Sequence, residues 1–251
     1  MDTLTIAISL LSFALSFIFA LGGVGSALVL IPTLVWLGIP FNLARPTGLF
    51  VNALSMSGAT YSNFREKRLD LKLGIPIVVS SVAIAPLGAW VGHLLPGHYV
   101  MYAFIAFLCF SGLMMMFFKK SKYENQYRED RPFTGPFLVG VLAGFFSGLL
   151  GVGGGGIISP LMIMQGFNPK KVATVTAFSV PFSSITAFAA YALMGSISVR
   201  LLIFAGLAAW AGGYMGTGFM HNRMKPGTVK KCLGAVLLLL AARLLWVVLT
   251  G

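Results

Sequence analysis

Long apolar stretches separated by short polar ones run along almost the whole chain. The pattern predicts ten helical segments, at approximately 3–21, 26–38, 43–64, 73–95, 99–118, 134–150, 154–167, 171–193, 199–220 and 229–250. A helix needs about 20 residues to cross a hydrocarbon core about 30 Å thick. The second and seventh segments are short for a full crossing, and both adjoin glycine-rich sequence. We therefore expect an all-α polytopic membrane protein.

The second half of this pattern repeats the first. GVGSALVLIPTLVWLGIP at 23–40 is matched by GVGGGGIISPLMIMQGFNP at 151–169. After one extra residue, ARPTGLF is matched by ATVTAFS, which aligns Thr47 with Thr176. Internal repeats of this kind are typical of secondary transporters. We expect a first membrane repeat at 1–118, a linker at 119–133 and a second membrane repeat at 134–251, with five segments in each repeat.

Composition and charge agree with a membrane protein and suggest its orientation. Hydrophobic residues make up 57% of the chain, charged residues only 10%, and the mean hydropathy is +0.90. A net charge of +12 would suggest nucleic-acid binding in a soluble protein. Here, all but three of the 18 Lys and Arg residues fall in the loops 65–72, 119–133, 168–172 and 221–231 if the linker is cytoplasmic. The positive-inside rule therefore predicts a cytoplasmic linker.

This orientation predicts how the two repeats are related. The segments on either side of each glycine run return to the side where they began, so 3–38 and 134–167 are expected to be helical hairpins broken by glycine. Loop 65–72 then lies inside, and its counterpart 194–200 lies outside. We expect two inverted-topology repeats, with both termini outside.

The glycine runs are candidate ligand sites. Non-helical backbone at membrane depth persists only where it is buried in protein or lines a cavity, and amides at the start of the following half-helix can hold an anion. The candidate substrate-binding glycines are Gly22, Gly23, Gly25, Gly153, Gly154, Gly155 and Gly156. The alternative role is close helix packing, which we expect of the G-x-x-x-G series 140–148. A G-x-G-x-x-G match at 151–156 is accidental, because no Asp or Glu follows Asp130.

Segments 43–64 and 171–193 are counterparts and are the most polar of the ten. Their hydroxyls and one amide can donate to an anion with several oxygens, and the candidates are Thr47, Asn52, Thr176, Ser179 and Ser183. Such side chains also bond back to their own helix or join helices together. Arg45, at the mouth of 43–64, can bind an anion or extend to the lipid headgroups.

The acidic residues exclude several classes of function. All six lie at a terminus or in loops, whereas cation pumps and proton relays carry acids inside the membrane. No catalytic acid–base pair or metal-ligand cluster can be assembled at membrane depth. We expect no enzyme, no metal and no cofactor, which leaves the transport of an anion or a neutral solute.

The glycine-rich turn leading to a proline (Gly22–Pro32 and Gly151–Pro160), the A-x-x-T element (Ala44–Thr47 and Ala173–Thr176) and the loop REKRLDLK resemble the TauE/SafE sulfite exporter family. This family is also called the toluene sulfonate uptake permease family, and the resemblance covers essentially the whole chain. It implies a bacterial or archaeal cytoplasmic (inner) membrane transporter of sulfite, thiosulfate or organosulfonates, with either direction of transport. The chain departs from the pattern at 26–28, where SAL stands opposite GGG, so we expect the second turn to be more open.

The expected function is secondary transport of a small sulfur-containing anion. The anion would bind at the glycine turns near the membrane midplane, and motion of the repeats would alternate access. An anion channel, in which the turns form a static filter, is one alternative. A non-transporting membrane factor that assembles a partner enzyme is another. The expected partners are the small anion and the lipid bilayer, and not nucleic acid.

Overall fold

The computed structural model describes residues 3–20, 24–117, 127–194, 199–223, 234–235 and 237–246, and most of these are helical. The helices are α1 (Thr3–Ala20), α2 (Ala27–Trp36), α3 (Phe41–Arg65), α4 (Leu71–Leu94), α5 (Gly97–Phe117), α6 (Thr134–Leu150), α7 (Gly155–Met164), α8 (Pro169–Leu193) and α9 (Val199–Arg223). A short helix, Leu237–Trp246, follows them. Helices α4, α5, α8 and α9 contain windows long and apolar enough to span a membrane. The expected all-helical, multi-pass fold is confirmed.

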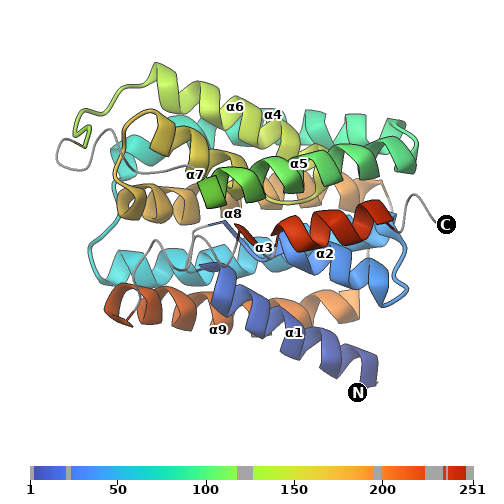
Figure 1. Cartoon of the computed structure of the whole chain (residues 1–251). Helices are drawn as coiled ribbons and strands as arrows, with labels where there is room; N and C mark the ends of the chain where they lie inside the picture. Colours follow the sequence, from blue (N-terminus) through green and yellow to red (C-terminus); the bar gives the residue numbers. More distant parts are fainter. Residues whose placement is uncertain are drawn as a thin grey trace.

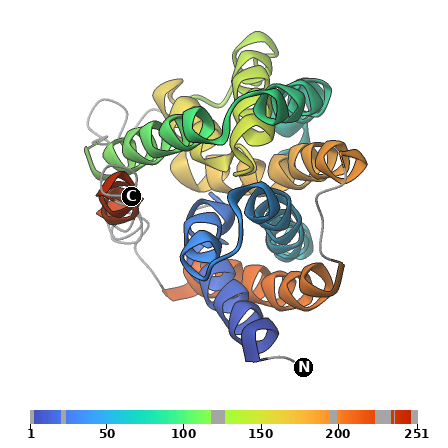
Figure 2. The ribbon, with the colours of Figure 1, turned by 90° about the vertical axis from the view of Figure 1, so that its right-hand side faces the viewer.

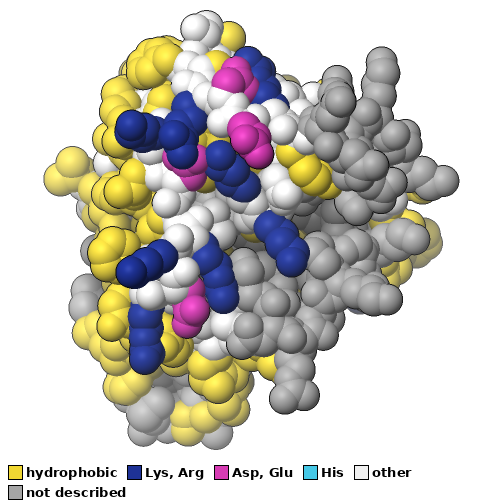
Figure 3. All heavy atoms as spheres, turned by 90° about the vertical axis from the view of Figure 1, so that its left-hand side faces the viewer, with side chains coloured by type: hydrophobic (Ala, Val, Ile, Leu, Met, Phe, Trp, Pro, Cys, Tyr) yellow, Lys and Arg dark blue, Asp and Glu magenta, His cyan; other side chains and the backbone are white. Residues whose placement is uncertain are grey.

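The helices run side by side, so that the described loops gather at two ends of the bundle (Figure 1). One end carries the loops 66–70, 127–133 and 165–168, and we call it the basic end because Lys and Arg side chains gather on it (Figure 3). The start of α1 and the end of helix Leu237–Trp246 both lie at the opposite end (Figure 1). The described part of the linker is therefore at the other end of the bundle from both of these segments.

Each half of the chain packs against the other in an exchanged pattern. Helix α1 packs along α9, and α6 packs along α4, so the first helix of each half contacts the fourth helix of the other half. These two pairs form opposite sides of the bundle when it is seen along its length (Figure 2). Helices α3 and α8 contact each other between the two pairs. Every one of these contacts has a counterpart if α1–α4 correspond to α6–α9.

Small residues allow the exchanged pairs to approach closely. On α6, a Cβ at Gly144 would lie 2.5 Å from the backbone oxygen of Ser81 on α4. On α9, a Cβ at Gly216 would overlap the backbone oxygen of Phe17 on α1. The sequence prediction that the glycine series 140–148 serves helix packing is confirmed, and the same device recurs in the second pair.

The segment boundaries agree with the sequence prediction to within a few residues, apart from segments that are only partly described. The short second and seventh segments are helices of 10 residues each. Of the linker 119–133, the structure describes 127–133. Of the last segment, 229–250, it describes only 234–235 and 237–246, so the length of that segment stays a prediction.

Candidate functional site

The turn between α6 and α7 is built from glycines in a left-handed conformation. Gly151 ends α6 with φ +80°, Gly153 has φ +77°, and Gly154 precedes the first residue of α7 with φ +72°. A residue with a Cβ is strained at such angles, which is why only glycine serves here without cost. Residues 151–160 are all buried. Gly155 and Gly156 already belong to α7.

The turn before α2 has the same form with fewer glycines. Gly25 has φ +87° and leads through Ser26 into α2. Ser26 and the next two residues stand where the second half has glycine, and all three are buried. Gly22 and Gly23, which the sequence analysis placed in the site, lie outside the described residues.

The two turns meet at the side chain of Asn52, which lies on α3 and is completely buried. A Cβ at Gly25 would overlap its Oδ1 atom, and a Cβ at Gly153 would overlap its Nδ2 atom. One glycine from each half therefore contacts the same amide. The structure brings together three of the candidates predicted from sequence, Gly25, Asn52 and Gly153.

The amide of Asn52 is hydrogen-bonded on both sides. Its Oδ1 accepts from the backbone N–H of Ala27, at 3.4 Å, and its Nδ2 donates to Oγ of Ser184 on α8, at 3.3 Å. Ala27 is the first residue of α2. The amide oxygen thus lies at a helix N-terminus, where partial positive charge and free N–H groups favour an anionic oxygen.

Ser184 belongs to this cluster. It is one of the hydroxyls of segment 171–193 but was not among the five candidate ligands chosen from the two polar segments. It is completely buried, and a Cβ at Gly153 would lie 2.7 Å from its Oγ. The internal repeat could have identified Ser184, because it falls opposite Ser55 when the alignment of 44–50 with 173–179 is continued. Oγ of Ser55 is also buried and has no hydrogen-bond partner within the described part of the chain.

The remaining hydroxyl candidates are buried but do not point to Asn52. Those of Thr47, Ser179 and Ser183 donate to backbone oxygens of their own helices, at 2.8, 2.9 and 3.1 Å. The hydroxyl of Thr176 accepts from Ser159 on α7, at 3.3 Å. In this conformation they bond within a helix or join two helices, as the alternative interpretation of the sequence held.

Arg45 is only 6% exposed, so its side chain is held inside the protein. Its Nη1 donates to the backbone oxygens of Gly92 and Leu149, at 3.0 and 3.3 Å, and to the hydroxyl of Tyr191, at 3.0 Å. Gly92 and Leu149 lie in the last turns of α4 and α6, where the helix dipoles favour a cation. Arg45 therefore joins α3, α4, α6 and α8.

Arg45 and Asn52 lie on the same face of α3. Seven residues, or about 10 Å of helix, separate them. Gly151 is close to Arg45, since a Cβ there would lie 2.9 Å from the Cβ of Arg45, while Gly153 is close to Asn52. The face of α3 that carries both residues is therefore covered by the turn between α6 and α7. The Nε atom of Arg45 is buried and has no hydrogen-bond partner in the described residues.

Comparisons with known proteins agree with the resemblance. Residues 8–244 match the family model described as Sulfite exporter TauE/SafE. The probable membrane transporter protein YunE of Bacillus subtilis (strain 168) is 25% identical over 249 residues, which cover 89% of this chain and 91% of that protein. The probable membrane transporter protein ORF9 of Sinorhizobium sp is 27% identical over 238 residues, 93% of this chain and 89% of that protein.

A group of plant relatives matches only a part of the chain. Sulfite exporter TauE/SafE family protein 6 of Arabidopsis thaliana is 44% identical over 54 residues, which cover 22% of this chain and 13% of the plant protein. No solved structure matches the chain significantly.

Proposed function

Because the chain belongs to the sulfite exporter TauE/SafE family, we propose that it is a secondary transporter of small sulfur-containing anions, namely sulfite, thiosulfate or an organosulfonate. We place the binding site where the two glycine turns meet Asn52. The observation that carries this placement is the shared contact of Gly25 and Gly153 with one buried amide. Family relatives named probable membrane transporters favour a transporter over an assembly factor.

In the proposed site, the anion takes the place of the amide oxygen of Asn52. Rotation of this side chain frees the N–H of Ala27 at the start of α2, and leaves the amide nitrogen of Asn52 and the hydroxyl of Ser184 as donors. Glycine at 25 and 153 lets an anion oxygen approach the backbone. Of the carboxylates that the structure describes, none lies inside the membrane-spanning part to repel it.

The exchanged packing supports the proposed inverted repeats, 1–118 and 134–251. The contacts of α1 with α9 and of α3 with α9 are matched by those of α6 with α4 and of α8 with α4. Relative motion of the repeats along the α3–α8 contact would expose the site to each side in turn. By the positive-inside rule, the basic end and linker 119–133 are cytoplasmic and both termini lie outside.

The test is uptake of labelled sulfite and of a labelled organosulfonate into proteoliposomes, with wild-type protein, Asn52→Ala and Asn63→Ala. Asn63 is a matched control, because it is a buried asparagine on the same helix but does not contact the glycine turns. Loss of two donors or acceptors at the site predicts at least about a tenfold decrease in the flux of Asn52→Ala. The flux of Asn63→Ala should stay within about twofold of wild type, because this substitution removes no group from the proposed site.

Three results would contradict the proposal. If Asn52→Ala elutes as a folded protein in size-exclusion chromatography and its flux equals that of wild type, the amide is not part of the binding site. Flux that does not saturate and shows no counterflow would indicate an anion channel. Absence of any sulfur-anion flux in wild-type proteoliposomes would favour the non-transporting factor or a different solute.

A further inference from the structure

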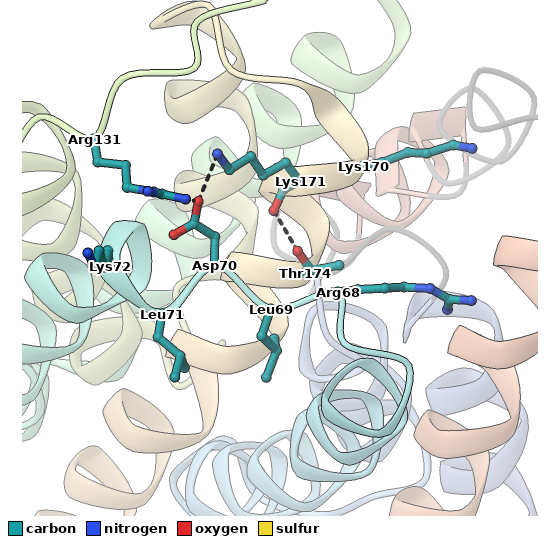
Figure 4. Close-up of a pocket in the computed structure, with 9 residues that line it drawn as sticks. All are labelled: Arg68, Leu69, Asp70, Leu71, Lys72, Arg131, Lys170, Lys171 and Thr174. Atoms are coloured by element: carbon teal, nitrogen blue, oxygen red, sulfur yellow. Dashed lines mark hydrogen bonds and ion pairs between the residues drawn. The ribbon is translucent and has the colours of Figure 1, made fainter.

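A second candidate site lies at the basic end, away from the glycine turns. A pocket of about 790 Å³ opens there between loop 66–70, the linker and the first turn of α8. Five Lys or Arg residues and one carboxylate line it, and they are Arg68, Asp70, Lys72, Arg131, Lys170 and Lys171 (Figure 4). The pocket therefore carries a large excess of positive charge.

On one side of the pocket, Asp70 pairs with two cations and offsets part of their charge. Oδ2 of Asp70 lies 3.0 Å from Nε of Arg131 and 2.8 Å from Nζ of Lys171. Its Oδ1 accepts from the backbone N–H of Leu73 and caps α4. Burial is the largest single influence on the pKa of Asp70 and raises it. The hydrogen bonds from Lys171, Arg131 and the backbone N–H of Leu73, together with the charge of Lys171, lower the pKa below its ordinary value, so Asp70 is ionised at neutral pH.

The other side of the pocket holds cations that Asp70 does not reach. Arg68 and Lys170 extend away from Asp70, in the same direction as each other (Figure 4). Nη1 of Arg68 is buried and has no hydrogen-bond partner among the described residues, and its Nη2 is 3.7 Å from the exposed carboxylate of Glu66. Neither Lys72 nor Lys170 has an ion pair in the described part of the chain.

The position of the pocket points to an anion. The positive-inside rule accounts for cations on loops, but here cations from three separate segments line one concavity. Helices α4 and α8 both begin beside it, so their N-termini add partial positive charge. Leu69 and Leu71 also line a smaller pocket of about 360 Å³, whose other residues include Ser57 and Thr60 of α3 and Pro181 of α8. These two helices carry Asn52 and Ser184.

We propose that this pocket binds a small soluble oxyanion, held by Arg68 and Lys170 at the mouth of the α3–α8 contact. A bound oxyanion also competes with Asp70 for Lys171 and Arg131, so binding loosens the ion pairs between loop 66–70, the linker and α8. The site's place on a transport path rests on the proposed function, whereas binding itself does not.

The test uses sulfate as the probe and lysine acylation as the readout. The full-length protein in phosphatidylcholine nanodiscs is treated with an uncharged acetylating ester, in sulfate or in chloride at equal ionic strength, and each lysine is followed by mass spectrometry. We expect sulfate to slow acetylation of Lys170 at least threefold and to leave Lys67 unchanged. Lys67 is exposed in the same loop but does not line the pocket.

Arg68→Gln should abolish the protection of Lys170, and Lys67→Gln should keep it. The two substitutions remove the same charge from adjacent positions of one loop, so the comparison separates binding in the pocket from the effect of net charge. Equal acetylation rates in sulfate and chloride in the wild-type protein would overturn the proposal. Equal protection in the two variants would overturn the role of Arg68.

Two further comparisons distinguish a soluble anion from a lipid headgroup, and this pocket from the transport site. Protection of Lys170 in chloride by phosphatidylglycerol nanodiscs, with none from sulfate, would overturn the soluble-anion site in favour of a lipid headgroup. If sulfate protects Lys170 but wild-type proteoliposomes carry no sulfur anion, the proposed function fails and this site stands. If the proteoliposomes carry the anion but sulfate gives no protection, only this site fails.

Discussion

Asn52 on α3 and Gly153 before α7 are in such close contact that a Cβ at position 153 would overlap the amide nitrogen of Asn52. Gly25 contacts the amide oxygen of the same side chain in the same way. The two residues therefore depend on each other: a larger residue at 153 displaces the amide, and displacement of the amide breaks its hydrogen bonds to Ala27 and Ser184.

Gly153→Ala should be more damaging than Gly38→Ala. Both glycines have a positive φ, +77° and +84°, but a Cβ at Gly38 meets nothing within 4 Å. Backbone strain alone costs about 1–3 kcal/mol, and position 153 adds the overlap with Asn52. We expect Gly153→Ala to lower the melting temperature further, by size-exclusion thermostability. Equal shifts for the two variants would show that Asn52 moves aside at no cost.

Arg45→Met should destabilise the protein strongly. The substitution leaves the backbone oxygens of Gly92 and Leu149 and the hydroxyl of Tyr191 without their shared donor. A buried acceptor left without its donor costs about 1–3 kcal/mol, and this substitution affects three of them. Tyr191→Phe, which removes one hydroxyl, should cost about 1–3 kcal/mol. Thermal unfolding in detergent measures both effects. An unchanged melting temperature for Arg45→Met would show that Arg45 does not stabilise the contacts among α3, α4, α6 and α8.

Asp70→Asn should weaken the basic end without disturbing the start of α4. Asparagine caps a helix as well as aspartate does, so the change reports the pairs with Arg131 and Lys171. We expect a loss of about 1 kcal/mol. Asp130→Asn is a suitable comparison, because the pair of Asp130 with Arg128 is exposed on both sides, and it should have no measurable effect.

Acid should abolish the difference between wild type and Asp70→Asn. The folded-state pKa of Asp70 is lowered from its ordinary value of 3.8. Its contribution is therefore complete above that pH and is lost as the pH falls through the lower folded-state pKa. Melting curves should show a constant difference between the two proteins from pH 7 to pH 5, and the difference should decrease only below the ordinary pKa of 3.8. A difference that shrinks between pH 7 and pH 5 would mean that the pKa is raised.

Single cysteines should report the orientation. In a variant without Cys109 and Cys232, we expect Gly97→Cys to react with an impermeant maleimide in intact cells. Lys67→Cys should react only after the cells are permeabilised. Gly97 is the first residue of α5, Lys67 lies in loop 66–70, and both are exposed. The start of α5 lies at the opposite end of the bundle from this loop (Figure 1). The reverse labelling pattern would place the basic end outside.

The sequence was most informative about the places where a helix is interrupted. Two short apolar segments beside glycine predicted the short helices α2 and α7, because hydrophobic length and glycine each act locally. Asn52 stood out because an amide in an apolar helix needs hydrogen-bond partners, and the structure supplies them from α2 and α8.

The partners of these residues could not be predicted in the same way. Arg45 is held by carbonyls at the ends of α4 and α6, and every residue type offers a carbonyl. The direction of the Ser179 hydroxyl depends on a side-chain rotation that leaves no trace in sequence. Ser184 becomes part of the cluster only because α8 packs against α3.

The shared amide has a consequence for how such a protein can be assembled. When the alignment of the two halves is continued, Asn52 falls opposite Pro181, so only one half supplies the group that both glycine turns contact. A homodimer of identical halves would present either two amides to its central axis or none. Joining the halves in one polypeptide removes that restriction. One half can then supply the single amide that fits between the two glycine turns, while the other half carries a different residue at that position.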